Sequence, residues 1–336
     1  MTSPGALALA TRGLRKSYGS RLALDGLDLS VPSGVVYGFL GPNGAGKTTT
    51  MRLLTGLLHP DAGAIELLGR PFTRNDRQRL FEVGALVESP SFYPYLSGRA
   101  NLRALAAAGA PVPKGRIEEL LELVGLRERA RDKVSGYSLG MKQRLGIAGA
   151  LLSDPKLLLL DEPANGLDPA GIVAMRETLR RLAASGKTVF VSSHLLAEVQ
   201  VLADVVGIIA RGRLVREGPL ESLLTDQGVV RVRLPVAATE RARNALQALG
   251  PVDVVDAPSV PTNDSVEMWL AIHVEPSRAA EVNRTLAEAG IFASGLESGT
   301  DLEMLFLELT GGEASSEGRM QGIGTPDAKG TTGAAS

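Results

Sequence analysis

The feature that most constrains this chain is a glycine-rich loop between an apolar run and a stretch with helical spacing. Residues 41–48 read Gly-Pro-Asn-Gly-Ala-Gly-Lys-Thr and match the pattern G-x-x-x-x-G-K-[ST]. The apolar run 35–40 precedes this loop, and helical spacing of apolar residues continues over 48–58. Because glycines let successive backbone N–H groups turn inward around anionic oxygens, the pattern predicts a phosphate-binding loop in an α/β fold.

The end of the loop carries two side chains with specific chemistry. Lys47 supplies a positive charge at the β/γ end of a nucleotide, and Thr48 can place its hydroxyl on Mg²⁺. A plain glycine-rich turn is the alternative, and the flanking strand and helix argue against it. The predicted nucleotide-binding residues of this segment are Gly41, Pro42, Asn43, Gly44, Ala45, Gly46, Lys47, Thr48 and Thr49.

Two adjacent carboxylates end a second apolar run. Leu157 to Leu160 reads as a buried strand, and Asp161 and Glu162 follow it. The carboxyl ends of parallel strands are where open α/β sheets bind their ligands, so these side chains are expected beside the phosphates. Asp161 is predicted to hold Mg²⁺ through its water shell, and Glu162 to act as the general base toward water. Alone, the pair could simply mark a strand leaving the core.

The amino-acid composition argues against several kinds of partner, site and targeting segment. Lys plus Arg total 36 against 37 Asp plus Glu, which gives no global field for nucleic acid or an anionic membrane. The chain has no cysteine, which excludes a disulfide framework and a Cys nucleophile, and its three histidines lie far apart. We expect no membrane-spanning helix and no signal peptide, because no apolar run is long enough and the first charges follow the apolar run at 6–10.

The remaining segments predict a helical insertion in a mostly parallel α/β core that ends near Leu224. Helices are expected at 98–107, 116–123 and 136–149, the last with Ser138 as its N-cap, and another strand at 188–191. The order of these segments predicts a nucleotide-binding domain over 1–224, an accessory domain over 225–311 and a tail over 312–336.

The accessory domain is predicted to be a small α+β unit. Its expected elements are strands at 229–234, 266–274 and 291–296, helices at 239–249 and 278–289, and a last apolar helix at 301–309. The tail is rich in Gly, Ser, Thr, Glu and Ala, and its few apolar residues cannot offset the entropy of ordering, so we expect it to be disordered.

These motifs and their order resemble the nucleotide-binding subunits of ABC transporters. Residues 138–144, Ser-Leu-Gly-Met-Lys-Gln-Arg, stand before the carboxylate strand and are similar to the family's signature sequence. The resemblance covers residues 7–224 and implies a P-loop NTPase core of ABC type that binds ATP and Mg²⁺. It also implies that Ser138 and Gly140 contact the γ-phosphate held by an opposite protomer, although 137–141 read Tyr-Ser-Leu-Gly-Met where the family usually has Leu-Ser-Gly-Gly-Gln.

Three further positions take expected roles from the resemblance. Tyr18 would stack on adenine, with a plain strand tyrosine as the alternative. Asp168 falls in a segment similar to the D-loop and is also, before Pro169, a good helix N-cap; both roles can hold together. His194 matches the switch histidine that reaches the γ-phosphate and joins Glu162 as an expected catalytic residue.

Glu88 stands where the family's Q-loop glutamine is expected, and this is the most consequential departure. A carboxylate can still ligate Mg²⁺ or its water, so Glu88 joins Thr48 and Asp161 as a predicted metal ligand, but it places a negative charge beside a triphosphate. The aromatics Phe92, Tyr93 and Tyr95 follow. They favour an interface with a membrane subunit or, alternatively, a satellite core.

The resemblance therefore predicts an ATP-hydrolysing subunit that dimerises with itself or a similar subunit and docks on separate permease subunits near 88–96. The end of the accessory domain, residues 302–311, resembles the extension of ATPases that accompany drug, antibiotic or lipid efflux permeases, which favours export. Its expected place is cytoplasmic, on the membrane face through the permease, with no nucleic-acid partner. A soluble ABC-type ATPase acting on ribosomes or nucleic acid is the alternative. A GTPase switch is disfavoured because no Asn-Lys-x-Asp sequence occurs.

Overall fold

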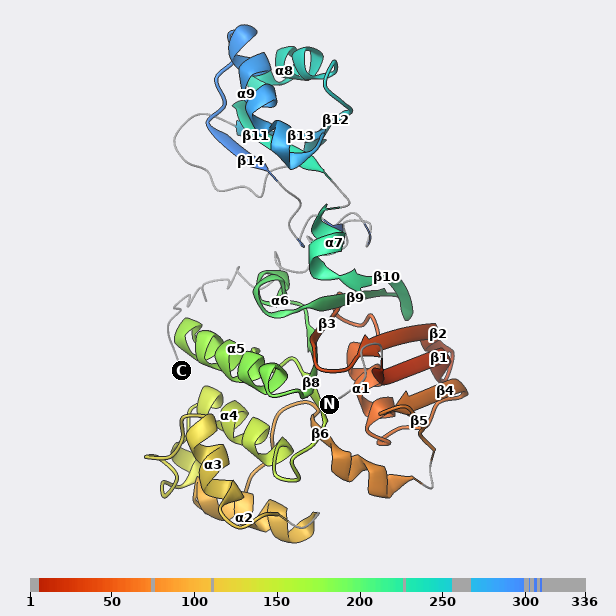
Figure 1. Cartoon of the computed structure of the whole chain (residues 1–336), viewed down its shortest axis with the longest axis vertical. Helices are drawn as coiled ribbons and strands as arrows, with labels where there is room; N and C mark the ends of the chain where they lie inside the picture. The colour runs from red at the N-terminus through yellow and green to blue at the C-terminus, as the bar shows by residue number, and fades with distance from the viewer. Residues whose placement is uncertain are drawn as a thin grey trace, which may run out of the picture.

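The computed structural model describes residues 6–73, 76–109, 112–225, 228–255 and 267–298, and four helical positions after them, Leu302, Leu305, Phe306 and Leu309. The first 225 residues contain two sheets with helices around them, and a small separate sheet with two helices follows (Figure 1). No helix in these described stretches has the length and apolar character to cross a membrane. The predicted tail over 312–336 lies outside the described residues.

A six-stranded sheet forms the centre of the nucleotide-binding part. Its strand order is β10-β9-β3-β8-β7-β6, and every neighbouring pair is parallel except β10 with β9. Strands β3, β7 and β8 are buried along their whole length, as strands covered on both faces must be. The six strands are β3 (Val36–Leu40), β6 (Val83–Leu86), β7 (Leu157–Asp161), β8 (Thr188–Ser193), β9 (Val205–Ala210) and β10 (Arg213–Pro219).

A second sheet is fully antiparallel, and the sequence indicates only part of one of its strands, through the alternation of apolar and polar residues over 27–31. It has the order β2-β1-β4-β5 and consists of β1 (Leu7–Tyr18), β2 (Arg21–Pro32), β4 (Ala62–Leu67) and β5 (Arg70–Pro71). Leucines from its inner face, among them Leu9, Leu14 and Leu27, are buried in one cluster with Phe39 and Met51. The sheet therefore packs against the central strand β3 and the helix that follows it.

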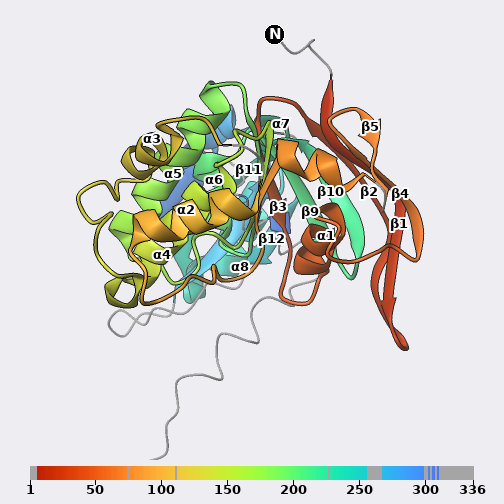
Figure 2. The same cartoon turned by 90° about the horizontal axis from the view of Figure 1, so that it is seen from below.

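Helices surround this core and form the expected insertion. Figure 2 shows the insertion on one side of β3 and the antiparallel sheet on the other. The helix after the glycine-rich loop is shorter than expected because Thr55 caps it and Gly56 has a φ of +69°. The helices are α1 (Lys47–Leu54), α2 (Gly98–Ala108), α3 (Arg116–Leu123), α4 (Leu139–Ala150), α5 (Pro169–Ala184), α6 (Leu196–Leu202) and α7 (Leu220–Thr225).

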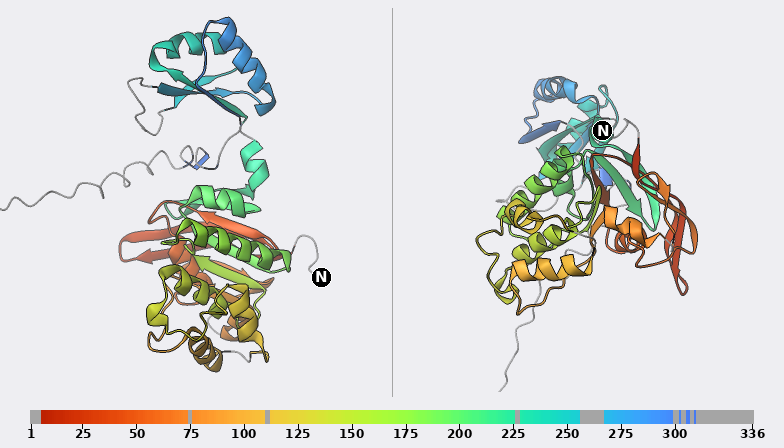
Figure 3. Two further views of the ribbon diagram at one scale, coloured as in Figure 1. Left: turned by 90° about the vertical axis from the view of Figure 1, so that its left-hand side faces the viewer. Right: turned by 60° about the horizontal axis from the view of Figure 1, so that its bottom comes forward.

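The small unit after residue 228 is an antiparallel sheet of order β12-β13-β11-β14 with two helices on one face, as Figure 3 shows. The chain order is β-α-β-β-α-β, the split βαβ arrangement. Its elements are β11 (Val229–Pro235), α8 (Thr239–Leu246), β12 (Val252–Val255), β13 (Glu267–His273), α9 (Ala279–Glu288) and β14 (Gly295–Ser298).

The structure corrects the expected elements of this unit in two places. The strand expected at 291–296 begins only at Gly295, because Ile291 caps the preceding helix: its N–H donates to Leu286 O at 2.9 Å and its side chain is buried. The sequence also missed β12, which pairs with β13 through Val252 opposite Ile272. Pro258, Pro261, Thr262 and Asn263, whose residue types indicate a loop, lie outside the described residues.

The described positions of the last helical segment pack away from the small sheet. Leu302, Leu305 and Phe306 are buried in a cluster with Leu40 and Val199 of the nucleotide-binding part. The N–H of Leu302 also donates to Gln200 Oε1 at 2.9 Å. The segment expected at 301–309 therefore contributes to the core next to strand β3, immediately before the glycine-rich loop.

Candidate functional site

The glycine-rich loop joins β3 to α1 in a conformation that its glycines permit. A Cβ on Gly41 would lie 2.5 Å from Ile209 O, so the loop begins where only a glycine fits against β9. Gly46 has a φ of +115° and is the N-cap of α1, so no side chain caps that helix. The first N–H groups of α1 therefore point at the loop without a side-chain partner, which is the arrangement that binds an anion.

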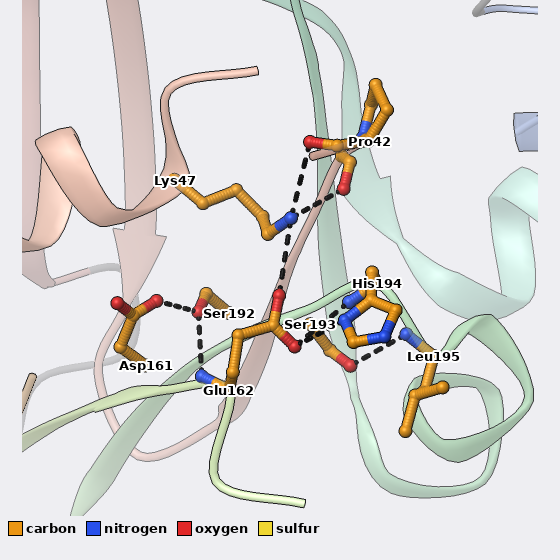
Figure 4. A network of polar contacts seen from close by, with 9 residues as sticks. Pro42, Lys47, Asp161, Glu162, Ser192, Ser193, His194 and Leu195 are labelled. Atoms are coloured by element: carbon orange, nitrogen blue, oxygen red, sulfur yellow. Dashed lines mark hydrogen bonds and ion pairs between the residues drawn. The ribbon is translucent and has the colours of Figure 1, made fainter. Parts of the chain in front are cut away.

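Lys47 turns its ammonium group back across this loop. The side chain is 6% exposed, and Nζ donates to Gly41 O at 2.6 Å and to Pro42 O at 3.4 Å. The same Nζ lies 3.3 Å from Glu162 Oε1 (Figure 4). The loop thus holds a nearly buried positive charge whose one charged partner among the described residues is a carboxylate from β7.

The two carboxylates after β7 have different surroundings. Asp161 is buried, and its carboxylate accepts a hydrogen bond from Ser192 Oγ of β8. The N–H of Glu162 donates to the same Ser192 Oγ at 3.0 Å. Ser192 therefore links the ends of two parallel strands, and it fixes the backbone from which both acids project.

Glu162 meets His194 at the edge of the sheet. Glu162 Oε2 lies 2.7 Å from His194 Nδ1 and accepts from the His194 N–H at 3.3 Å (Figure 4). Glu162 has a φ of +47°, a left-handed conformation that is strained for a residue with a Cβ. The hydrogen bonds with Ser192 and His194 hold the residue there, and its carboxylate lies between a cation and an imidazole.

These groups share one cleft of about 570 Å³. Tyr18 enters it from the end of β1, and Asp161 lies beneath it without lining it. Of the predicted loop residues, Gly41 and Ala45 are also absent from the lining. The residues that line the cleft are Tyr18, Arg21, Ala23, Pro42, Asn43, Gly44, Gly46, Lys47, Thr48, Thr49, Glu162, Asn165 and His194.

Sequence reasoning missed Arg21, Ala23 and Asn165. Asn165 had a local signal, since it follows Glu162 by three residues and its N–H donates to Glu162 O at 3.0 Å in a turn. Arg21 and Ala23 had none, because they lie in the first part of β2, before its alternating run 27–31.

Glu88 is not among the residues that line the cleft. It follows β6 with a φ of +66°, and its carboxylate pairs with the Arg52 guanidinium in the last turn of α1. This hydrogen bond, together with the negative charge of Glu88, raises the pKa of Arg52 above its usual value. The predicted metal ligand therefore has a cationic partner of its own in this structure.

The signature residues also lie outside the cleft. Ser138 caps α4 and accepts from the Met141 N–H at 3.2 Å, as predicted, and Gly140 follows in the first turn. Asp168 caps α5 by accepting from the Gly171 N–H at 3.0 Å. The two helix N-termini are neighbours, because a Cβ on Gly166 would lie 2.4 Å from Leu139 Cδ2. They form a surface separate from the lined cleft of the same chain.

The aromatic side chains of the loop after Glu88 have two different surroundings. Phe92 packs against the core cluster of the helical insertion. Tyr93 and Tyr95 are 54% and 66% exposed, and their rings lie 5.9 Å apart. Phe92 is therefore half-buried against the core, whereas the two tyrosines lie on the surface, and their contact with a membrane subunit stays a prediction.

Two ionisable groups support the strands around the cleft. Asp61 accepts from Lys16 Nζ and from the Ser17 N–H, each at 2.7 Å, and these bonds, the Lys16 one foremost, lower the pKa of Asp61. Tyr37 of β3 is buried and donates to Glu217 Oε1 at 2.5 Å. Burial first, and then the Glu217 charge, raise the pKa of Tyr37 well above its usual value.

The residues present fit a nucleotide with Mg²⁺ better than a metal held by protein alone. Among the described residues no three His, Asp or Glu side chains gather to hold a metal ion. Mg²⁺ keeps several waters and is usually bound through one or two carboxylates and substrate phosphates. The hydroxyl of Thr48 and the buried carboxylate of Asp161 are a donor set of that kind.

Known proteins share this arrangement of sequence and fold. The family model described as "ABC transporter" matches residues 24–165. The bacitracin transport ATP-binding protein BcrA of Bacillus licheniformis is 49% identical over 216 residues, which cover 64% of this chain and 71% of that protein. The daunorubicin resistance ATP-binding protein DrrA3 of Streptomyces coeruleorubidus is 37% identical over 313 residues, which cover 90% of this chain and 96% of that protein.

Solved structures agree with these relatives. One described as the structure of the ATP binding subunit of an ABC transporter has a TM-score of 0.58 and is 30% identical, covering 64% of this chain and 91% of that chain.

Proposed function

Because this chain belongs to the ABC transporter family, we propose that it is the ATP-hydrolysing subunit that powers export through separate membrane permease subunits. The predicted fold class, a P-loop core of ABC type, is confirmed by the solved cassettes that resemble it. Hydrolysis of ATP is likewise the activity of the family. The observation that carries the proposal is the single cleft in which Lys47, Glu162 and His194 surround the uncapped N-terminus of α1.

In this proposal the loop and Lys47 bind the phosphates, and Tyr18 stacks on the adenine. The α1 N–H groups and Nζ of Lys47 supply charge-assisted hydrogen bonds to the β- and γ-phosphates. When bound, Mg²⁺ neutralises charge that develops on the phosphate oxygens, and Thr48 and Asp161 would hold it. Pro42, Asn43 and the other loop residues shape the cradle.

Glu162 then accepts a proton from the attacking water. Its carboxylate is 22% exposed, so it is desolvated in part and yet reachable by water. His194 Nδ1 at 2.7 Å orients the carboxylate, and the other ring nitrogen remains for the γ-phosphate. Lys47 can leave Glu162 for the phosphates once ATP arrives, which would free the carboxylate for its role as base.

Dimerisation with itself or with a similar subunit completes the site. Ser138 and Gly140 lie on the N-terminus of α4, outside the cleft of their own chain, where a second protomer can receive them. A helix N-terminus with a hydroxyl is suited to the γ-phosphate. Asp168, whose helix starts beside α4, would carry the signal between the two sites.

Permease subunits are proposed to dock near residues 88–96, where Tyr93 and Tyr95 are exposed. Docking places the chain at the cytoplasmic membrane face. We propose three parts of the chain as well: residues 1–224 for the nucleotide-binding domain, 225–311 for the accessory domain and 312–336 for the tail, with the last helix returning to the first domain.

The proposed cargo is a drug, an antibiotic or a lipid-like molecule. This cargo class is inferred from the relatives, whose names concern bacitracin, lantibiotics and daunorubicin. The test first asks whether an adjacent reading frame encodes a membrane protein of about six helices, and then reconstitutes that protein with this chain in vesicles. ATP-dependent movement of a peptide antibiotic or an anthracycline supports the proposal, and ATP hydrolysis with no association with that membrane protein contradicts it. No observation favours the ribosome-bound or nucleic-acid alternative.

A further inference from the structure

Arg21 places a guanidinium in the nucleotide cleft that has no polar partner among the residues that the structure describes. It lines the cleft from the first position of β2, and its side chain is exposed. Within the described part of the chain its guanidinium makes no hydrogen bond and no ion pair, whereas neighbouring arginines such as Arg15 and Arg213 both pair with Asp25. An unpaired cation at an anion-binding site is free to attract the charge of a bound ligand.

The guanidinium lies directly beside the phosphate-binding loop. A Cβ on Gly44 would lie 3.2 Å from Arg21 Nη2, so the guanidinium covers the turn of the loop. Lys47 approaches the loop from within and is nearly buried. Arg21 approaches from the antiparallel sheet, on the solvent side. The two cations therefore reach the loop from different directions.

The strand pairing fixes Arg21 in relation to Tyr18. The two residues are directly opposite each other at the end of the β1–β2 hairpin, with Gly19 and Ser20 between them. Residues directly opposite in an antiparallel pair point to the same face of the sheet. Both side chains line the cleft, and Asp61 anchors the base of the hairpin through Lys16 and Ser17.

From this placement we propose that Arg21 is a second phosphate-binding cation, which holds the phosphate chain of the nucleotide while Tyr18 holds the base. This inference rests on the proposed nucleotide site. A planar guanidinium with several donors is suited to a bidentate contact with phosphate oxygens. The hairpin thus contacts the nucleotide at both ends, and affinity gained from Arg21 grows with the number of phosphates.

The test compares the affinities of Arg21→Gln for ATP, ADP and AMP by calorimetric titration of the full chain, with magnesium chelated so that ATP stays intact. We expect ATP binding to weaken about three- to tenfold, ADP binding less and AMP binding by under about twofold. Arg21→Lys should restore part of the loss. The ATP difference should shrink at ~1 M salt, where the Debye length is ~3 Å.

Arg12→Gln is the matched control. Arg12 lies on β1 of the same sheet, is exposed and pairs with Glu66, and it does not line the cleft. The Arg12→Gln substitution removes one positive charge, as Arg21→Gln does, and should leave the affinities for ATP, ADP and AMP unchanged. Equal loss for ATP and AMP in Arg21→Gln would overturn the proposal, since it would mean that only Tyr18 had moved. The proposal would also be overturned if Arg21→Gln bound ATP, ADP and AMP with unchanged affinity.

Lys47→Ala, titrated in parallel, separates failure of this inference from failure of the site. If Lys47→Ala weakens ATP binding and Arg21→Gln does not, the inference alone is wrong. If neither weakens it, the proposed nucleotide site is wrong as well.

Discussion

Replacing Glu162 with glutamine tests the proposed chemistry most directly. The substitution keeps the size and shape of a side chain that contacts Lys47 Nζ at 3.3 Å and His194 Nδ1 at 2.7 Å. It removes the negative charge and with it the ability to take a proton from water. Because the backbone at Glu162 is held by Ser192, its conformation should not change.

Two magnitudes follow from this geometry. Loss of a general base costs about 10²–10⁴ in rate, or about 2.7–5.4 kcal/mol at the transition state. The ion pair with Lys47 joins side chains that are only 6% and 22% exposed, and breaking a pair this buried can cost about 3–5 kcal/mol of folding free energy. A urea titration of Glu162→Gln therefore has to show that the variant is folded before its lower rate is assigned to the lost base. ATP affinity should stay the same or rise, because a negative charge beside the phosphates is gone.

The assay measures ATP turnover, ATP affinity and particle size on one preparation of each protein. Glu162→Gln should bind ATP, fail to hydrolyse it and accumulate as a dimer with ATP and Mg²⁺, whereas the protein without nucleotide stays mostly monomeric. Glu177→Gln, an exposed carboxylate on α5, is the control and should behave as the unaltered protein.

Two results would refute this reasoning. A turnover loss under about tenfold would remove Glu162 from the role of general base. A monomer with ATP demonstrably bound would contradict a site shared between two protomers.

Three further substitutions test other parts of the site. Lys47→Ala should weaken ATP binding about tenfold or more without unfolding the core, because charge-assisted bonds of about 1.5–3 kcal/mol each are lost; titration of the folded variant checks it, and an unchanged affinity would remove Lys47 from the site. Glu88→Ala should lower hydrolysis by less than Glu162→Gln does and lower vesicle transport further. Changes under about threefold in both would show that Glu88 serves only its ion pair with Arg52. Tyr37→Phe should cost about 1.5–3 kcal/mol of unfolding free energy by urea titration near neutral pH, through the lost bond to the Glu217 carboxylate. Since the folded-state pKa of Tyr37 is raised, its contribution is full below ~10 and lost as pH rises above that, so the variant should show a flatter alkaline decline; equal declines would refute the buried bond.

The chemistry of the central loop was predictable because it depends on residues close together in the chain, whereas the export assignment came from resemblance to a family. The loop over 41–48 and the N-caps Ser138 and Asp168 each act within a few residues of their own position. Their hydrogen bonds close short rings, so spacing alone specifies them. The same locality explains why most helices of the nucleotide-binding part lay near their expected positions.

Other features depended on pairing between distant segments. The antiparallel sheet brings Tyr18 and Arg21 to the loop, and the last helical segment returns to pack beside Leu40. The residues around Leu302 and Arg21 in the sequence do not predict which distant part of the chain each side chain contacts.

The sequence by itself determined the phosphate-binding loop, the acids at the strand end and the family to which they point. The tertiary structure decided that Glu162 lies between Lys47 and His194, that Glu88 pairs with Arg52, and that Ser138 stands outside the cleft of its own chain. The physical reason is that a local motif is stabilised by bonds between near neighbours. A site built from several strands depends instead on which apolar faces are buried together, and that is settled only when the whole core packs.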